Sequence, residues 1–347
     1  MTKELFGKLN DGTETFLYTI ENSKNMKAAI TDYGAALVSL WVPDKNGTFQ
    51  DVVLGYDDPI SYEENSGCLG GTIGRNSNRI KDAKLTIEGI EYQLDANDNG
   101  NNLHSGLKYY HKRKWEVTAF LENKITLTYN SPHMDQGYPG NLIVDVTYEI
   151  TENNGLSITY EGISDRTTIF NMTNHSYFNL SGHASGSILE QELWVDADMF
   201  TIADAESIPT GEFVPVKGTP MDFTRKKALS EEIESDYEPL KMAGGYDHNW
   251  ILNTDELFGE AAQLEDKKTG IQMVVFTDCP GVQIYTGNYL VEGLKGKEGV
   301  VYGPRHGICL ETQYYPDAMN HENFPQPILH AGEKRQSKTI YQFEVIK

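Results

Sequence analysis

Residues 142–150 read LIVDVTYEI and form the longest run in the chain in which apolar and polar side chains alternate. One side carries Leu142, Val144, Val146, Tyr148 and Ile150, and the other carries Asp145, Thr147 and Glu149. A period of two predicts a half-buried β-strand. The turn sequence NNG at 153–155 leads into a second alternating run at 156–160, so we expect two strands joined by a tight turn.

The same pattern extends outward from this pair. Alternating runs at 125–129 and 341–345 predict further strands, and residues 85–94 predict a hairpin around Glu88 and Gly89. Helical signal is scarce. We expect one short helix at 226–236, with Leu229 and Ile233 on its inner face, and one helical turn at 61–65. Residues 181–187 and 204–223 are expected to be surface loops or the rim of a site.

Strands at short spacing along the whole chain favour an all-β fold, a single large antiparallel β-sandwich with few short helices. No Pro/Ser-rich linker and no low-complexity tract interrupts the 347 residues. We therefore expect one domain over residues 1–347.

Charge and cysteine content narrow the possible partners. The chain has 51 acidic and 29 basic residues, a net charge of −22, which disfavours nucleic-acid and anionic-membrane partners. No apolar run is long enough to cross a bilayer, and residues 1–11 lack the apolar stretch of a secretory signal. The three cysteines form no CxxC pair, and we expect buried free thiols in a reducing compartment. These observations predict a cytoplasmic protein without nucleic-acid or membrane partners. We also expect a small-molecule substrate and either a monomer or a homodimer.

Several familiar motifs are absent from the sequence. Residues 70–74 (GGTIG) are glycine-rich but lack the GxGxxG spacing, and no GxxxxGK[ST] occurs. The nine histidines form neither HExxH nor HxxxH, so no metal site is expected from their spacing. Ser105, which follows His104, does not lie in a GxSxG motif, so the sequence gives no support for a serine hydrolase.

Two segments carry the strongest chemical signal. Residues 171–180 read NMTNHSYFNL, and as a strand they would place His175 and Tyr177 in one row of polar and aromatic side chains. Residues 308–316 read ICLETQYYP and place Glu311 in an apolar and aromatic strand. A carboxylate there needs a partner or a cleft, and an ion pair with Arg305 or another basic residue is the alternative to a functional role.

Three further segments offer groups suited to polyols. They are GRNSNRI at 74–80, GYDHNW at 245–250 and VQIYTGN at 282–288, which contain Asn78, Arg79, Asp247 and Gln283. Planar amide, carboxylate and guanidinium groups beside an aromatic platform can hold a sugar. Together the five segments predict a sugar pocket.

These segments resemble the aldose 1-epimerase (galactose mutarotase) family. The resemblance also includes LH at 103–104, DQGYPGN at 135–141, and LETQ at 310–313 with PD at 316–317, and it covers residues 20 to 345 in the family's order. It implies a β-sandwich with the sugar in an open cleft, no cofactor or metal, Glu311 as general base and His175 as general acid. The residues that match the family's sugar-binding positions are Asn78, Arg79, His104, Tyr177, Asp247 and Gln283. Ser105 and residues 303–306 depart from the pattern, and we expect them to alter contacts at the rim.

The resemblance predicts interconversion of the α and β anomers of free aldohexoses such as galactose and glucose. A carboxylate with an ordinary pKa is ionised at pH 7 and can take the C1 hydroxyl proton, while an imidazolium supplies a proton to the ring oxygen. A hexose-phosphate 1-epimerase, with Arg75, Arg79 and Arg305 for the phosphate, and a non-catalytic sugar-binding module stay as alternatives. Glycoside hydrolysis is less favoured because it normally needs two carboxylates, of which Asp247 would be the second.

Overall fold

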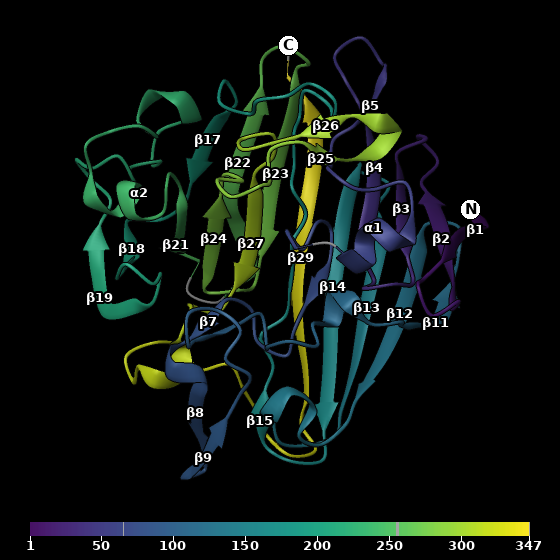
Figure 1. The fold of residues 1–347 in the computed structure, drawn as a ribbon. Helices are drawn as coiled ribbons and strands as arrows, with labels where there is room; N and C mark the ends of the chain where they lie inside the picture. Colours follow the sequence, from purple (N-terminus) through teal and green to yellow (C-terminus); the bar gives the residue numbers. More distant parts are fainter. Residues whose placement is uncertain (65, 255–256, 347) are drawn as a thin grey trace.

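The computed structural model describes residues 1–64, 66–254 and 257–346, which fold mainly into antiparallel strands (Figure 1). The largest sheet has nine strands. In spatial order they are β11 (Glu116–Phe120), β12 (Lys124–Ser131), β13 (Leu142–Ile150), β14 (Gly155–Ser164), β29 (Lys334–Val345), β23 (Ile271–Thr277), β22 (Gly259–Asp266), β17 (Glu192–Val195) and β20 (Lys227–Ala228).

Two five-stranded sheets accompany the large one. The N-terminal sheet contains β1 (Thr2–Lys8), β2 (Glu14–Glu21), β3 (Lys27–Thr31), β4 (Leu37–Pro43) and β5 (Phe49–Asp51), in that order. The other, which bears the candidate site, contains β19 (Pro209–Pro215), β18 (Met199–Ala203), β21 (Asp247–Ile251), β24 (Gly281–Tyr285) and β27 (Cys309–Gln313).

Short elements complete the described part of the chain. Paired short strands are β6 (Thr72–Ile73) with β16 (Thr173–Asn174), β7 (Arg79–Ile80) with β10 (Asn102–Leu103), β8 (Lys84–Ile87) with β9 (Ile90–Gln93), β15 (Thr168–Ile169) with β28 (Ile328–Leu329), and β25 (Leu294–Lys295) with β26 (Val301–Tyr302). The α-helices are α1 (Pro59–Glu64) and α2 (Glu238–Met242). The 3-10 turns are η1 (Lys81–Ala83), η2 (Tyr110–Lys112), η3 (Asp135–Gly137), η4 (Leu229–Glu231), η5 (Lys297–Gly299) and η6 (Ala318–Asn320).

One hydrophobic core joins the three larger sheets. It includes Ile30 of β3, Val146 of β13 and Val282 of β24, each fully buried. Strand β13 shows the cause, because every second position from Leu142 to Ile150 is apolar and buried, while the positions between them are partly or fully exposed. The alternation that marks the strand in the sequence therefore turns one face of the sheet into the core, and the predicted β-sandwich is confirmed.

Most expected strands are confirmed. Strand β13 has the predicted bounds and pairs with β14 in a regular antiparallel register in which Ile150 faces Leu156. The expected hairpin at 85–94 is β8 and β9, and residues 341–345 form the end of the longer strand β29.

The helix expected at 226–236 is wrong. Residues 227–228 form the edge strand β20, in which Lys227 pairs with Leu193 of β17, and the 3-10 turn η4 follows. Leu229 and Ile233 are both buried as expected. The sequence therefore predicted which side chains enter the core, but it did not predict the backbone conformation. Pairing with the sheet edge satisfies backbone groups that a helix would have used internally.

Two other expectations need adjustment. The helical turn expected at 61–65 is confirmed as α1, which begins two residues earlier, and residue 65 lies outside the described residues. The segment 204–223, expected to be a loop, contains strand β19, which pairs with β18.

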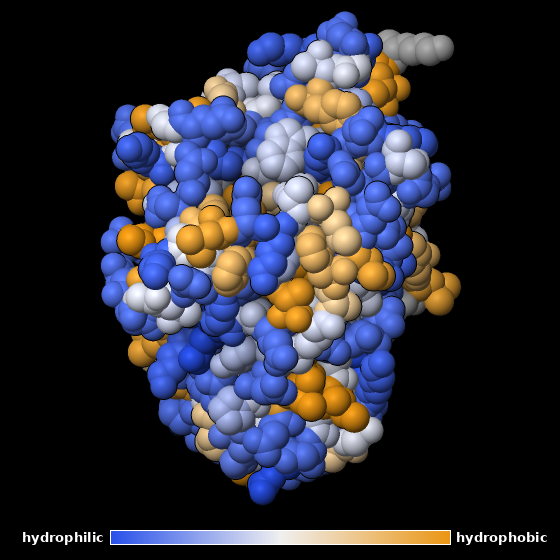
Figure 2. Space-filling view, turned by 90° about the vertical axis from the view of Figure 1, so that its right-hand side faces the viewer, coloured by the Kyte–Doolittle hydropathy of each residue, from blue (hydrophilic) through white to orange (hydrophobic). Residues whose placement is uncertain are grey.

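On the side that carries β1 to β5, apolar side chains form small groups separated by hydrophilic ones (Figure 2). Within the described residues, no helix combines the length and apolar character needed to span a membrane.

Candidate active site

Strands β21, β24 and β27 lie side by side and present one polar face. Gln283 on β24 pairs directly with Glu311 on β27, and Tyr285 two residues further along β24 pairs with Asp247 on β21. Paired residues of antiparallel strands point to the same side of the sheet, as do residues two apart on one strand. The register therefore brings the side chains of Asp247, Gln283 and Glu311 together, although 64 positions separate the first from the last.

A cleft of about 190 Å³ opens over this face. It collects every predicted site residue except Gln283, and its lining comprises Ser66, Gly67, Cys68, Asn78, Arg79, Leu103, His104, His175, Tyr177, Asp247, Tyr285, Tyr289, Leu290, Val291, Leu294 and Glu311. Gln283 lies next to the cleft, where its Nε2 donates a hydrogen bond to Oδ1 of Asp247 across 2.7 Å.

The segment 171–180 is not the continuous strand that its alternation predicts. Only β16 (Thr173–Asn174) pairs as a strand, and the chain then exchanges hydrogen bonds with several different segments. The amide of Leu54 donates to the carbonyl of Tyr177, and Phe178 forms an isolated bridge with Ile308. Because the chain changes partner in this way, the polar and the apolar side chains of 171–180 are all buried. The same path places His175, which is 6% exposed, against Glu311 of β27.

His175 and Glu311 form a close buried pair. Nε2 of His175 lies 3.7 Å from Oε1 of Glu311. The carboxylate has no contact with Arg305, whose guanidinium instead bonds to Gly244, Thr286 and Asn288. An ion pair between Glu311 and Arg305, one form of the alternative role, is therefore wrong.

Burial shifts both members of the pair from their ordinary protonation behaviour. Desolvation, reinforced by the nearby Asp247 carboxylate and opposed by Arg79, raises the pKa of Glu311 well above its usual range. Desolvation also lowers the pKa of His175 to about 4. The expectation of a carboxylate with an ordinary pKa is therefore wrong, since a sequence does not reveal how completely the fold removes water from one side chain.

His104 is held in one tautomer by the backbone. The amide N–H of Asn78 donates to Nδ1 of His104 across 3.2 Å, so the neutral ring carries its proton on Nε2. Burial lowers the pKa of His104 well below its ordinary value, with nearby His175 and Arg79 adding to the effect. The side chain is thus a neutral hydrogen-bond donor toward the cleft.

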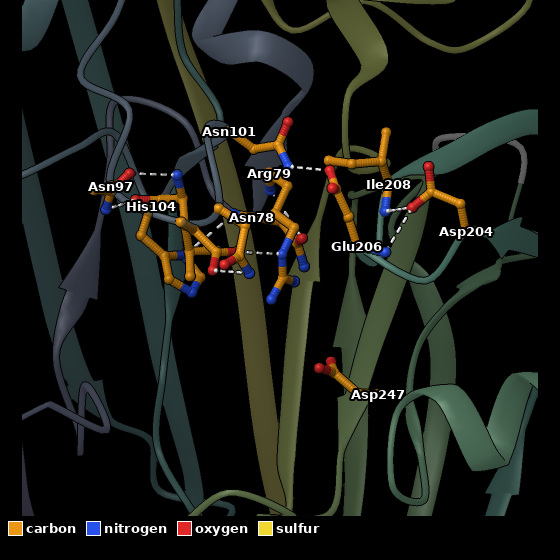
Figure 3. A network of polar contacts seen from close by, with 12 residues as sticks. Asn78, Arg79, Asn97, Asn101, His104, Asp204, Glu206, Ile208 and Asp247 are labelled. Atoms are coloured by element: carbon orange, nitrogen blue, oxygen red, sulfur yellow. Dashed lines mark hydrogen bonds and ion pairs between the residues drawn. The ribbon is translucent and has the colours of Figure 1, made fainter.

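Arg79 and Asp247 approach the cleft from opposite sides (Figure 3). Nε of Arg79 donates to Oδ2 of Asp98 across 2.8 Å, which orients the guanidinium. In the same network Asn101 donates to Glu206 across 3.0 Å, which ties the 204–208 turn to the segment that carries Asp98, the partner of Arg79 (Figure 3). Burial raises the pKa of Asp247, while Arg79 and Gln283 oppose that effect.

His104, His175 and Glu311 offer ligand atoms that all lie within 4.8 Å of one another. Sequence spacing could not detect this cluster because its members come from three distant segments. The tautomer of His104 argues against a metal there, since Nδ1 accepts the amide of Asn78 and the protonated Nε2 has no lone pair to donate.

Sequence reasoning missed some residues of the cleft. Tyr285 lines it beside Gln283, and its parity with Gln283 on β24 was a signal that could have identified it. All three cysteines are free and buried as expected, but Cys68 also lines the cleft and Cys309 contacts His175. Ser105, expected to alter the rim, is buried and exchanges hydrogen bonds with the backbone of Asn76.

The β-sandwich carries a polar cleft with a buried histidine–carboxylate pair, and comparison with known proteins identifies the family to which the chain belongs. A sequence model of the aldose 1-epimerase family matches residues 17–342. The chain is 36% identical to a galactose mutarotase of Sus scrofa over 99% of both chains, and 34% identical to an aldose 1-epimerase of Escherichia coli over 96% of both. The crystal structure of an aldose epimerase homologue from C. elegans superimposes with a TM-score of 0.88 at 29% identity, covering 96% of this chain and 100% of that one.

The chain therefore belongs to the aldose 1-epimerase family, whose members are isomerases. The family resemblance read from the sequence is confirmed over nearly the whole chain.

Proposed function

We propose that the protein is an aldose 1-epimerase that interconverts the α and β anomers of free aldohexoses such as galactose and glucose. The observation that carries the proposal is the buried pair itself, in which a histidine nitrogen and a carboxylate oxygen lie 3.7 Å apart at the floor of a polar cleft. Anomer exchange needs one proton removed from the C1 hydroxyl and one delivered to the ring oxygen. Both oxygens are bonded to the same carbon, so the acid and the base have to be close together.

In the proposed reaction Glu311 removes the C1 hydroxyl proton while His175 protonates the ring oxygen. The bond between C1 and the ring oxygen breaks, and an aldehyde forms at C1. Rotation about the C1–C2 bond presents the other face of the aldehyde. The two proton transfers then run in reverse and close the other anomer.

The shifted pKa values fit this cycle. Ring opening starts from ionised Glu311 and protonated His175, and it ends with protonated Glu311 and neutral His175. Burial disfavours both charges, so the empty cleft favours the second, neutral state. The two states differ only in the position of one proton, and sugar hydroxyls that hydrogen-bond to the carboxylate favour its ionised form.

The remaining predicted residues would bind the sugar. Asp247, held by Gln283, accepts from hydroxyl groups, while Arg79, Asn78 and the Nε2–H of His104 donate. Tyr177 is oriented by a hydrogen bond from its hydroxyl to the carbonyl of Gly67 and packs against the ring of His175. Since these groups supply protons and hydrogen bonds, the reaction needs no cofactor.

The hexose-phosphate alternative has little support from the basic side chains it would need. Arg75 is 1% exposed, and its guanidinium bonds to the carbonyls of Pro132, Pro139 and Gly140. Arg305 is committed to Gly244, Thr286 and Asn288. Of the three arginines considered for a phosphate, only Arg79 lines the cleft.

We propose further that the protein works in the cytoplasm as one domain, in a monomer or homodimer. The strongly acidic charge and the buried free cysteines support a reducing, crowded compartment. Sedimentation velocity of the full chain separates the two assembly states directly.

Polarimetry tests the activity. Freshly dissolved α-D-galactose, α-D-glucose and α-D-glucose 6-phosphate are followed with and without the protein. We expect faster mutarotation of both free sugars and a lower kcat/KM for the phosphate. A higher kcat/KM for the phosphate would establish the hexose-phosphate alternative. Sugar binding without acceleration would make the chain a binding module, and release of nitrophenol from an aryl glycoside would make it a glycosidase.

A further inference from the structure

The two histidines of the cleft differ in what holds their Nδ1 atoms. Nδ1 of His104 accepts a backbone N–H, which fixes its proton on Nε2. Nδ1 of His175 lies 3.4 Å from the thiol sulfur of Cys309, a distance that allows an N–H···S or S–H···N hydrogen bond. Cys309 is fully buried, and it stands two residues before Glu311 on the same face of β27.

The direction of this hydrogen bond decides what His175 can do. A histidine that passes a proton through Nε2 alternates between imidazolium and the neutral ring protonated on Nδ1, so Nδ1 keeps its hydrogen throughout. The group that contacts Nδ1 therefore has to accept a hydrogen bond from it. If the thiol donated instead, the neutral ring would carry its proton on Nε2 and could not take another proton there.

A thiol is also an unusual acceptor for a catalytic histidine. A carboxylate or carbonyl partner on Nδ1 stabilises the imidazolium and makes it a weaker acid. A neutral sulfur is a weak acceptor and adds little such stabilisation. The contact can therefore orient the ring while leaving the imidazolium strongly acidic toward the ring oxygen of a sugar.

We propose that Cys309 is a positioning residue for His175, whose Nδ1–H its sulfur accepts, so that Nε2 is the nitrogen that exchanges protons. The claim that Cys309 positions the ring rests on the 3.4 Å contact between its sulfur and Nδ1 of His175. The claim that this affects catalysis rests also on the proposed function. The backbone of His175 also hydrogen-bonds to its own imidazole, which opposes the lowering of the pKa by burial, but no other side chain around the ring takes the place of Cys309. Glu311 lies at Nε2, and the remaining neighbours contact the ring through aromatic packing: His104, Tyr177 and Tyr285.

The tautomer can be measured without any activity. In protein labelled with ¹⁵N-histidine, the ¹⁵N shifts and long-range couplings of each imidazole show which nitrogen is protonated, and His175→Asn assigns the His175 signals. At pH 7 we expect neutral His175 to carry its proton on Nδ1, whereas His104 carries it on Nε2. In Cys309→Ala the His175 ring should move toward the Nε2–H form, which free histidine prefers. A wild-type His175 protonated on Nε2 would overturn the proposal, whatever the activity of the protein.

Kinetics supply the second readout. Cys309→Ala should lower kcat for galactose by roughly 10-fold and change KM less than about 2-fold, since ring orientation matters for proton transfer rather than for sugar binding. Cys309→Ser retains an acceptor and should recover most of the rate. Cys279 offers a matched control, because it is also buried and free and its amide bonds to Thr277, so Cys279→Ala should leave kcat unchanged. Equal kcat values for Cys309→Ala and wild type would overturn the proposal even if the protein is an active epimerase.

Discussion

The side-chain amide of Gln283 donates a hydrogen bond to Asp247 across 2.7 Å, and Gln283 itself stands directly opposite Glu311 in the sheet. Gln283 thus bonds to Asp247, the carboxylate proposed to bind the sugar, and lies next to Glu311, the proposed base, on the neighbouring strand. The carboxylates of Asp247 and Glu311 thus lie on one small sheet face, and we propose different roles for them.

Asp247→Ala should chiefly weaken sugar binding. A carboxylate that holds hydroxyl groups stabilises bound sugar and transition state alike, so we expect KM to rise about 10-fold or more while kcat falls less than about 3-fold. Initial mutarotation rates over a range of galactose concentrations measure both constants. A large fall in kcat at unchanged KM would instead assign Asp247 to proton transfer.

Glu311→Gln and His175→Asn should each lower kcat by about 100-fold or more, because each removes one titrating group while sugar binding is retained. The double variant should be hardly slower than the slower single variant, since groups that act as a unit are not additive. Titration calorimetry with galactose checks binding. Glu265→Gln is the control, because Glu265 is also buried but pairs with Lys226 on the large sheet. A folded Glu311→Gln protein with wild-type kcat would rule out the proposed base.

The pH dependence of kcat/KM should reflect the buried pair. The pKa of His175 is lowered to about 4, and that of Glu311 is raised, so the pair keeps a single proton over a wide range. Activity should fall as pH drops through about 4, where a second proton binds, and again as pH rises through the raised pKa of Glu311, where the last proton leaves. Ordinary pKa values would confine the active range to between about pH 4 and 6.5. Full activity at pH 8 therefore supports the shifted pair, and loss of activity just above pH 6.5 contradicts it.

Glu311→Gln should stabilise the fold at alkaline pH. A group whose folded-state pKa is raised contributes stability that is fully present below its unfolded pKa and is lost as pH rises through the folded pKa. The amide never ionises, so the variant avoids this loss. We expect its Tm to exceed that of the wild type by a few degrees at pH 8 and to match it below about pH 4. Calorimetric melting curves at both pH values check the difference, and a lower Tm at pH 8 would contradict the desolvation of Glu311.

Activity should not depend on a metal ion. Although His104, His175 and Glu311 cluster together, the Asn78 amide occupies the lone pair of Nδ1 in His104 and leaves Nε2 protonated. Exhaustive dialysis against EDTA is expected to leave the mutarotation rate unchanged. A loss of rate that added zinc or magnesium restores would show that the cluster binds a functional metal.

The sequence predicted the site better than it predicted the local backbone. Alternation located β13 without error, because every second position from Leu142 to Ile150 is apolar and buried. It failed at 226–236, where Leu229 and Ile233 have helical spacing but the chain pairs with the edge of the sheet. It also failed to reveal that the backbone of 171–180 hydrogen-bonds to several different segments in turn instead of pairing with one strand. Motifs that match a family identify side chains regardless of backbone shape, which is why His175 and Glu311 could be named although the backbone around His175 was not predicted; the structure places both in one cleft.

The effects of burial could not be read from the sequence. The raised pKa of Glu311 depends on desolvation by several strands together, and the contact between Cys309 and His175 joins residues 134 positions apart. Cys309 is buried, as expected for a free thiol among apolar neighbours, but no periodicity in one segment reports what a side chain touches in another.

Strand β29 has a consequence for how the protein is made. It comes from residues 334–345, yet it lies in the middle of the nine-stranded sheet, between β14 and β23. During synthesis the strands on its two sides leave the ribosome long before the strand that joins them. Each half-sheet exposes an unpaired edge until then, and such edges favour aggregation. Nascent chains halted near residue 333 should therefore depend on chaperones and lack activity, and release of the final strand should let the large sheet close.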